Sequence, residues 1–180
     1  MFEVTTEFYP NIHSDMMEIF TGQVPSLEEC VQCGKCCSNL RTGNEKTGLT
    51  LFPEEIHLFP EDKIRPYIGK GVDSVTEIFT YQQTENVCVH LVDNKCKIYF
   101  ERPTMCRSFP VKVGEYGLRF ISGCMGVRDM MKNSQKMTHD MYEVKAAIKM
   151  TERLYDFHKS FEEDEKRWQY NLVTEEWETY

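Results

Sequence analysis

The sequence predicts a small α+β fold organised around bound metal, in which short helices and β-hairpins surround the cysteines and a long C-terminal helix packs on them. Three observations favour this class. Eight cysteines occur in 180 residues, too few for a disulfide scaffold and too clustered for incidental core packing. Turn signals separate runs of strand-forming residues, as in β-hairpins. Residues 127–170 contain no proline or glycine, which favours a helix.

The composition favours a soluble, cytoplasmic protein with one main domain. A net charge of −8 argues against general nucleic-acid binding, which needs a surplus of lysine and arginine. Residues 1–15 lack the basic and apolar regions of a secretory signal, and no run approaches the roughly 20 apolar residues of a membrane span. In a reducing compartment, clustered thiols are expected to ligate metal or to act in catalysis rather than to form disulfides.

The chain divides into four predicted segments. They are a leader (1–27), a cysteine-cluster metal-binding domain (28–126), a helical extension (127–161) and an acidic, aromatic tail (162–180). The tail carries seven acidic and two basic side chains, and it contains Trp168, Tyr170, Trp177 and Tyr180. Aromatic residues in a charged segment are typical of a docking peptide, so we expect a protein partner for the tail and the helical extension. Packing of Trp168 against the body of the protein is the alternative.

Several elements are predicted along the chain. Residues 50–59 form a short helix with Pro53 in its first turn, and residues 61–68 are weakly helical or irregular. A turn at residues 69–71 and a strand at residues 75–81 follow. The Asp93-Asn94 pair predicts a hairpin between residues 87–92 and 95–99. A second hairpin pairs residues 111–113 with 118–121.

Apolar residues recur at helical spacing through the proline- and glycine-free segment. We expect one long amphipathic helix between residues 127 and 170, or two helices joined by a kink near Asn133-Ser134. The methionines and aromatic residues on its apolar face are expected to pack as core. They include Met137, Met141, Met150, Phe157 and Phe161.

The first cysteine group contains Cys30, Cys33, Cys36 and Cys37. Gaps of two residues let consecutive thiolates converge on one centre, as in zinc and iron–sulfur sites. A helix would place the first, second and fourth of these cysteines on one face and turn Cys36 away. An extended chain would point Cys36 and Cys37 to opposite sides. The adjacent pair is therefore not expected to serve one small centre together, and the leftover thiol is a candidate for redox chemistry.

The second group contains Cys88, Cys96, Cys106 and Cys124. Eight thiols suit two four-thiolate sites, or one site and four other cysteines. Residues 88–132 carry eight basic side chains against four acidic ones. Such cations stabilise an anionic thiolate centre, and we expect Arg102 and Arg107 beside it. His90 is the one histidine placed to act as a ligand or proton carrier, and an ordinary hairpin residue is the simpler interpretation.

These residues together resemble a known family. The match consists of Cys30-x2-Cys33-Gly34-x-Cys36-Cys37, Cys88-x2-Leu91 and Cys96-x-Ile98-Tyr99-x2-Arg102-Pro103-x2-Cys106-Arg107-x-Phe109-Pro110, closed by Cys124. This pattern is similar to the YkgJ-like cysteine-cluster family, a zinc- or iron-chelating domain. The resemblance covers about residues 28–126 and implies that the eight cysteines ligate metal. We also expect Lys35 beside the centre, together with Arg102 and Arg107. A related pattern in flagellin lysine methylases, which use S-adenosylmethionine and are associated with a 4Fe-4S cluster, favours iron over zinc.

Three functions follow as hypotheses. The first is an iron–sulfur protein holding one or two clusters of the 4Fe-4S type, for electron transfer, redox sensing or maturation of a partner enzyme. The second is an interaction module stabilised by zinc, in which metal replaces missing core. The third is an enzyme related to the flagellin lysine methylases. A hydrolytic zinc site is disfavoured because such sites usually use histidine or carboxylate ligands, and none of the five histidines falls in a metal-binding pair.

Overall fold

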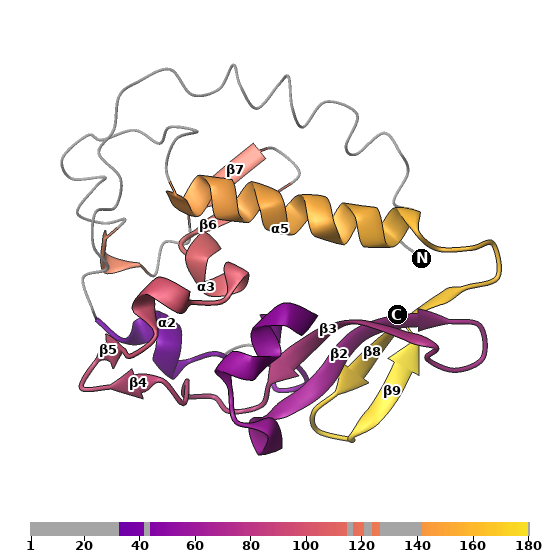
Figure 1. Ribbon diagram of the computed structural model, residues 1–180, viewed down its shortest axis with the longest axis horizontal. Helices are drawn as coiled ribbons and strands as arrows, with labels where there is room; N and C mark the ends of the chain where they lie inside the picture. The colour runs from indigo at the N-terminus through magenta and orange to yellow at the C-terminus, as the bar shows by residue number, and fades with distance from the viewer. Residues whose placement is uncertain (1–32, 42–43, 115–116, 121–123, 127–141, 180) are drawn as a thin grey trace.

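The computed structural model describes residues 33–41, 44–114, 117–120, 124–126 and 142–179. They form a mixed α+β fold with a five-stranded sheet, two small hairpins and a C-terminal helix (Figure 1). The strand order of the sheet is β1-β3-β2-β8-β9, and every pair of neighbours is antiparallel. The predicted fold class is confirmed in this coarse form. The predicted leader (1–27) lies outside the described residues.

The first three strands of the sheet are β1 (Leu49–Leu51), β2 (Ile64–Gly71) and β3 (Glu77–Gln83). The expectation of a weak helix followed by a turn at residues 61–71 is wrong, because only Glu61–Lys63 is helical, as the 3-10 turn η3, and β2 occupies the rest. The register of β2 shifts on either side of Ile68, so the strand lacks a regular alternation of buried and exposed residues. Gly69 is required in β2, since a Cβ there would meet the Glu77 carbonyl oxygen at 2.6 Å.

The end of the chain forms the other two strands, β8 (Lys166–Asn171) and β9 (Glu176–Thr179). The helical expectation up to residue 170 is therefore wrong. Strand β8 pairs with β2, and the Trp168 indole N–H donates to the Gly71 carbonyl oxygen at 3.0 Å. Trp168 thus packs on the body of the protein, which was the alternative to an exposed docking aromatic.

A buried glutamine ties the sheet together. The Gln82 side chain donates to the carbonyl oxygens of Pro66 and Tyr170, at 2.9 and 3.1 Å, and accepts from the Gly48 N–H at 2.8 Å. These bonds satisfy a fully buried polar group and join β2, β3 and β8. Beside the sheet lies an apolar cluster of Leu49, Leu51, Phe59 and Cys88.

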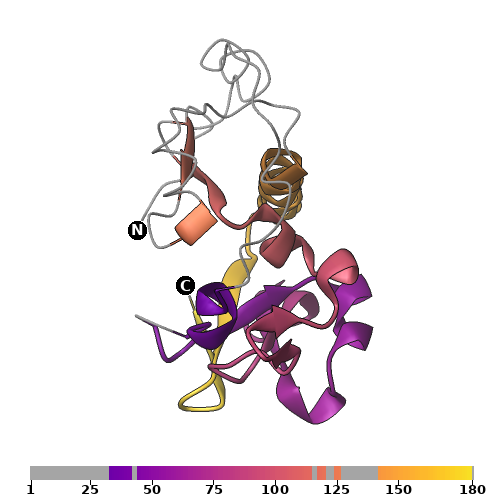
Figure 2. The ribbon, with the colours of Figure 1, turned by 90° about the vertical axis from the view of Figure 1, so that its left-hand side faces the viewer.

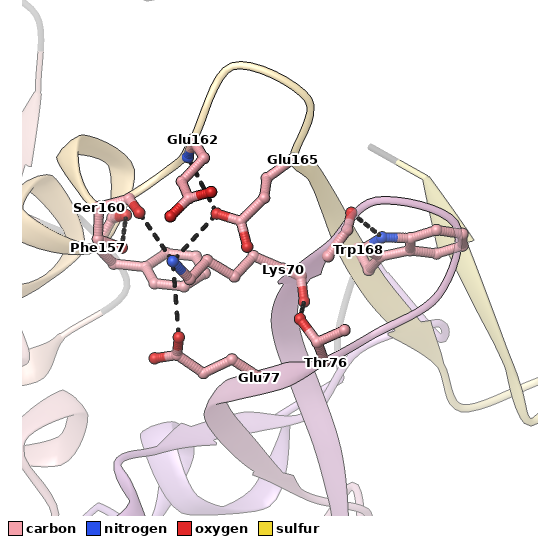
Figure 3. Close-up of polar contacts among 9 residues, drawn as sticks. Lys70, Thr76, Glu77, Phe157, Ser160, Glu162, Glu165 and Trp168 are labelled. Carbon is pink, nitrogen blue, oxygen red and sulfur yellow. Dashed lines mark hydrogen bonds and ion pairs between the residues drawn. The ribbon is translucent and has the colours of Figure 1, made fainter.

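Helix α5 (Tyr142–Lys159) ends at a polar cluster around Lys70 (Figure 3). The Lys70 ammonium donates to the Ser160 carbonyl oxygen at 2.7 Å and to the Glu165 carboxylate at 3.1 Å, and it also pairs with Glu77 at 3.6 Å. A cation that binds the last carbonyl groups of a helix stabilises its C-terminus. The contact therefore stabilises the end of α5 at Lys159, close to the end of the helical extension predicted for residues 127–161.

The same helix packs across the domain, as Figure 2 shows by looking along it, with α3 (Thr104–Ser108) beneath it. The Phe157 ring stacks on Phe79 with 4.1 Å between centroids, and Arg153 lies over the Phe52 ring and pairs with Glu54. The predicted start of this helical region and its kink near residues 133–134 fall outside the described residues. A long C-terminal helix that packs on the cysteine-bearing elements is confirmed for residues 142–159.

Candidate metal centre

A tight hairpin positions Cys96. Strands β4 (Leu91–Val92) and β5 (Lys95–Cys96) pair antiparallel, and Leu91 lies opposite Cys96. The two turn residues, Asp93 and Asn94, have φ values of 50° and 62°. Positive φ at both positions is the conformation of a type I′ turn, which matches the twist of a hairpin. The predicted hairpin is confirmed, although residues 99–101 turn into a short 3-10 helix, η4, instead of extending the second strand.

Cys36 and Cys37 lie on the single-turn helix α2 (Lys35–Ser38). Gly34 precedes it with φ of 69°, and a Cβ there would come within 3.0 Å of the Asn94 side-chain oxygen. Glycine is therefore needed both for the backbone conformation and for contact with the hairpin turn. The Cys88 N–H donates to the Cys37 carbonyl oxygen at 2.7 Å, which joins the two cysteine groups directly.

Helix α3 carries Cys106, and Glu55 anchors its first residue. Glu55 comes from the 3-10 helix η2 (Pro53–Leu58), which replaces the longer helix predicted for residues 50–59, because residues 49–51 form β1. One Glu55 carboxylate oxygen accepts from the N–H and hydroxyl of Thr104, both at 2.7 Å, and the other accepts from the Phe52 N–H at 2.9 Å. A carboxylate at the start of a helix complements its unpaired N–H groups.

The structure brings five of the eight cysteines to one place. A cavity of about 1370 Å³ is lined by Cys36, Cys37, Cys88, Cys96 and Cys106. A smaller cavity of about 140 Å³ is lined by three of these, Cys36, Cys37 and Cys96. Burial raises the pKa of the Cys106 thiol, and negative charge on Cys88, Cys36 and Cys96 raises it further. Thiols that oppose one another's ionisation in this way lie close together. The two cysteine groups of the sequence thus meet in one cluster, which we call the thiol cluster.

The adjacent cysteines do not point apart. The Sγ atoms of Cys36 and Cys37 are 3.7 Å apart, although the sequence predicted that they point to different sides. Whether both serve one centre stays a prediction. Consecutive residues of a helix are rotated by about 100°, so the side-chain rotamers of the two cysteines decide how close their sulfurs come. The hydrogen bond from Cys37, opposed by burial, lowers the pKa of Cys36 to about 7, whereas the same bond and burial raise the pKa of Cys37. These directions favour ionisation of Cys36 over ionisation of Cys37.

A cation lies beside the thiol cluster. The charge of the Arg102 guanidinium favours a lower pKa for the Cys36 and Cys106 thiols. Arg102 is held in place by its Nε–H bond to the Tyr99 carbonyl oxygen at 2.7 Å and by the Tyr99 ring, whose centroid is 3.7 Å from the guanidinium carbon. Arg107 donates to the Arg102 carbonyl oxygen, and Lys35 lines the larger cavity. Sequence reasoning missed Tyr99, whose signal is the spacing of an aromatic residue three positions before Arg102.

Among the described residues, two other predicted ligands are not brought into the thiol cluster. Cys33 and Cys124 are half-buried and line neither cavity, and Cys30 lies outside the described residues. His90 packs on the Phe59 ring, and its Nε2 lies 2.7 Å from the Leu58 carbonyl oxygen, so it has a structural partner. Within the part of the chain that the structure describes, no group of three His, Cys, Asp or Glu side chains is placed to hold a single metal ion.

The fold and this cluster define a cysteine-rich α+β protein whose soft sulfur donors suit a metal centre. The chain belongs to the CxxCxxCC family, described as a "putative zinc- or iron-chelating domain", which matches residues 29–138. The resemblance inferred from the sequence is confirmed, and with it a metal-binding cysteine cluster. No curated protein and no solved structure matches the chain. In the described residues, no helix has the length and apolar character to cross a membrane.

Proposed function

We propose that the thiol cluster binds an iron–sulfur cluster, of the 4Fe-4S type, through Cys36, Cys88, Cys96 and Cys106. The convergence of thiols from α2, β5, α3 and the segment before β4, next to Arg102, carries this proposal. Four cysteine thiolates are the ligand set of a 4Fe-4S cluster. Such a cluster would supply one-electron chemistry. Arg102 would stabilise the net negative charge of the thiolates, and the Cys37 thiol would donate a hydrogen bond to the Cys36 sulfur.

The spacing of the thiols supports a cluster over a single ion. Each thiolate of a 4Fe-4S cluster binds a different iron atom, so its ligands lie farther apart than those of one ion. The five cysteines surround a cavity, and the described residues contain no group of three donors close enough for one ion. Cys36 and Cys37, at 3.7 Å, are too close for both to be ligands of different irons. We therefore assign Cys37 an outer position.

The redox role follows from the surroundings of the centre. Positive charge and hydrogen bonds to the sulfurs raise the reduction potential of an iron–sulfur cluster. Arg102 and Cys37 supply both here. We propose electron transfer or redox sensing, for the protein itself or for a cytoplasmic partner enzyme. Ligand roles for Cys30, Cys33 and Cys124, in this centre or a second one, remain part of the proposal, with Lys35 and Arg107 as neighbouring cations.

The decisive experiment measures iron and acid-labile sulfide, with visible and EPR spectra, on protein purified without oxygen. We expect stoichiometric iron and sulfide in the wild type. Replacement of Cys88 or Cys106 by serine should abolish both, whereas Cys37→Ser should retain the cluster. Equal loss in the Cys37→Ser variant would contradict the assigned ligands. A colourless protein with stoichiometric zinc would contradict the iron–sulfur proposal.

A single zinc ion is the second candidate, and one distance favours it. Two thiolates on a tetrahedral ion with bonds of about 2.3 Å are about 3.8 Å apart. The Cys36 and Cys37 sulfurs, at 3.7 Å, match that separation. In this case both adjacent cysteines are ligands, together with two of Cys88, Cys96 and Cys106. Cys37→Ser then loses the metal, which is the opposite of the result expected for the cluster.

A further inference from the structure

The larger cavity extends well beyond the thiol cluster. Its volume of about 1370 Å³ exceeds the roughly 300–1,000 Å³ typical of small-molecule sites. One wall consists of the cysteines, and the opposite end is formed by the last turns of α5 and by Arg167 on β8. In Figure 1 these two ends correspond to α2 at one side of the molecule and to the α5–β8 connection at the other. The lining residues thus come both from the proposed metal centre and from β8 of the central sheet.

The charges around this cavity have one sign. Acidic residues outnumber basic ones by 29 to 21 in the chain, yet no acidic residue occurs among the described residues that line the cavity. The basic lining residues are Lys35, Arg102, Lys112, His158, Lys159 and Arg167. A cleft lined by one sign of charge focuses the electrostatic field and concentrates ligands of the opposite charge. The lining therefore selects for an anion.

Three of these basic residues, His158, Lys159 and Arg167, lie at the end away from the thiol cluster. The Arg167 Nη1 lies 3.3 Å from the His158 Nε2, and Lys159 lies over the Tyr155 ring at 4.3 Å from its centroid. Burial lowers the pKa of His158, and the positive charge of Arg167 lowers it further. The electrostatic potential at this ring is therefore positive. A thiolate centre is itself anionic, so it would repel an anion that binds close to the cysteines. The anionic group of a ligand is therefore expected at His158, Lys159 and Arg167.

The wall between the two ends is apolar. Helix α5 contributes Ala147, Met150 and Leu154 to the lining. Sequence periodicity predicted this face as core, but Met150 and Leu154 are only half-buried, because part of the face borders the cavity. Apolar walls with a few polar groups at one end are the usual composition of a small-molecule site.

From these observations we infer that the cavity binds a small organic anion with an apolar body, such as a medium-chain carboxylate. The head group binds His158, Lys159 and Arg167, and the body lies along α5 toward the thiol cluster. The inference deepens the proposed function by giving the metal centre a substrate-binding site. It depends on that function only for the orientation of the ligand.

The test uses the full chain, loaded with metal, and the fluorescent probe 8-anilinonaphthalene-1-sulfonate displaced by decanoate. We expect saturable displacement by decanoate and none by decylamine. Lys159→Gln and Arg167→Gln should each weaken decanoate binding by about tenfold, the value of one charge-assisted hydrogen bond. Lys149→Gln removes an exposed charge from the same helix outside the cavity lining and should leave binding unchanged.

Two further measurements keep the outcomes separate. Met150→Trp fills the apolar part of the cavity without changing charge, and it should also weaken binding if the body lies there. Circular dichroism of each variant shows that it is folded, and Lys159 is exposed enough for its replacement to be tolerated. Equal affinity for decanoate and decylamine, or equal binding by Lys159→Gln and Lys149→Gln, would overturn the inference. Metal analysis of the same samples tests the proposed function independently. A protein that contains metal but does not bind decanoate refutes only the anion site.

Discussion

The central sheet and the thiol cluster are stabilised in different ways. The sheet has continuous hydrogen-bonded strands, the buried Gln82 side chain and the Lys70 polar cluster. The elements around the cysteines are a four-residue helix, a five-residue helix and a hairpin with two-residue strands. Elements this short are not stable by themselves. The sheet is thus stabilised by its own contacts, whereas we propose that the elements around the thiol cluster depend on bound metal.

Removal of metal tests this comparison most strongly. We expect anaerobic chelation under reducing conditions to abolish protection from hydrogen exchange in α2, β4, β5 and α3, because metal binding and local folding are coupled. Amides of β2, β3 and β8 should keep their protection. Peptide-resolved hydrogen exchange with mass spectrometry measures both regions in one sample. Restored protection after reconstitution is the control, and equal exchange in both regions before and after chelation would refute the difference.

The sequence predicted the cysteine region better than the sheet, for a physical reason. The Asp93-Asn94 turn and the cysteine spacing are local signals, and a hairpin between neighbouring residues follows from them. Strand β2 contains Pro66 and shifted register, and β8 follows a helical pattern without proline or glycine. Their pairing joins residues about 100 positions apart in the chain. No local pattern encodes such a partner.

For the candidate site, too, the sequence predicted local features but not long-range contacts. It identified every thiol of the cluster and the neighbouring Arg102, because the ligand types and their spacing can be read directly from the sequence. It left open whether the two cysteine groups form one site or two. The answer depends on the Cys88 N–H bond to the Cys37 carbonyl oxygen and on Gly34 against Asn94. The basic end of the cavity was also missed, since His158 and Arg167 approach each other only when β8 folds back beside α5.

A mutation on the sheet side should destabilise the whole described domain. Phe157 is 4% exposed and stacks on Phe79. Phe157→Ala is expected to lower the free energy of unfolding by about 3–5 kcal/mol, the usual cost of removing a buried phenylalanine. Chemical denaturation monitored by circular dichroism measures the change.

The matched control lies on the cysteine side. Phe100 on η4 is 91% exposed, and Phe100→Ala should change the free energy of unfolding by less than about 0.5 kcal/mol. Similar losses in the two variants would mean that the contact between α5 and the sheet contributes little. That outcome would remove the basis for treating the sheet side as the self-sufficient part of the fold.

The smallest expected effect is a pH dependence at the junction of α5 and β8. Burial and Arg167 hold the pKa of His158 below its ordinary value, so the folded state resists protonation. Stability is full above the unfolded pKa of about 6.5 and falls as the pH decreases toward the folded pKa, because the unfolded state then binds more protons. His158→Gln should remove this loss of stability, which is below about 1 kcal/mol for a partly exposed ring.

The exposed His57, replaced by Gln, is the control. Thermal melts between pH 7.5 and pH 5.5 should therefore show a smaller acid shift for His158→Gln than for the wild type or His57→Gln, and identical shifts in all three would mean that the charge on His158 does not affect this junction.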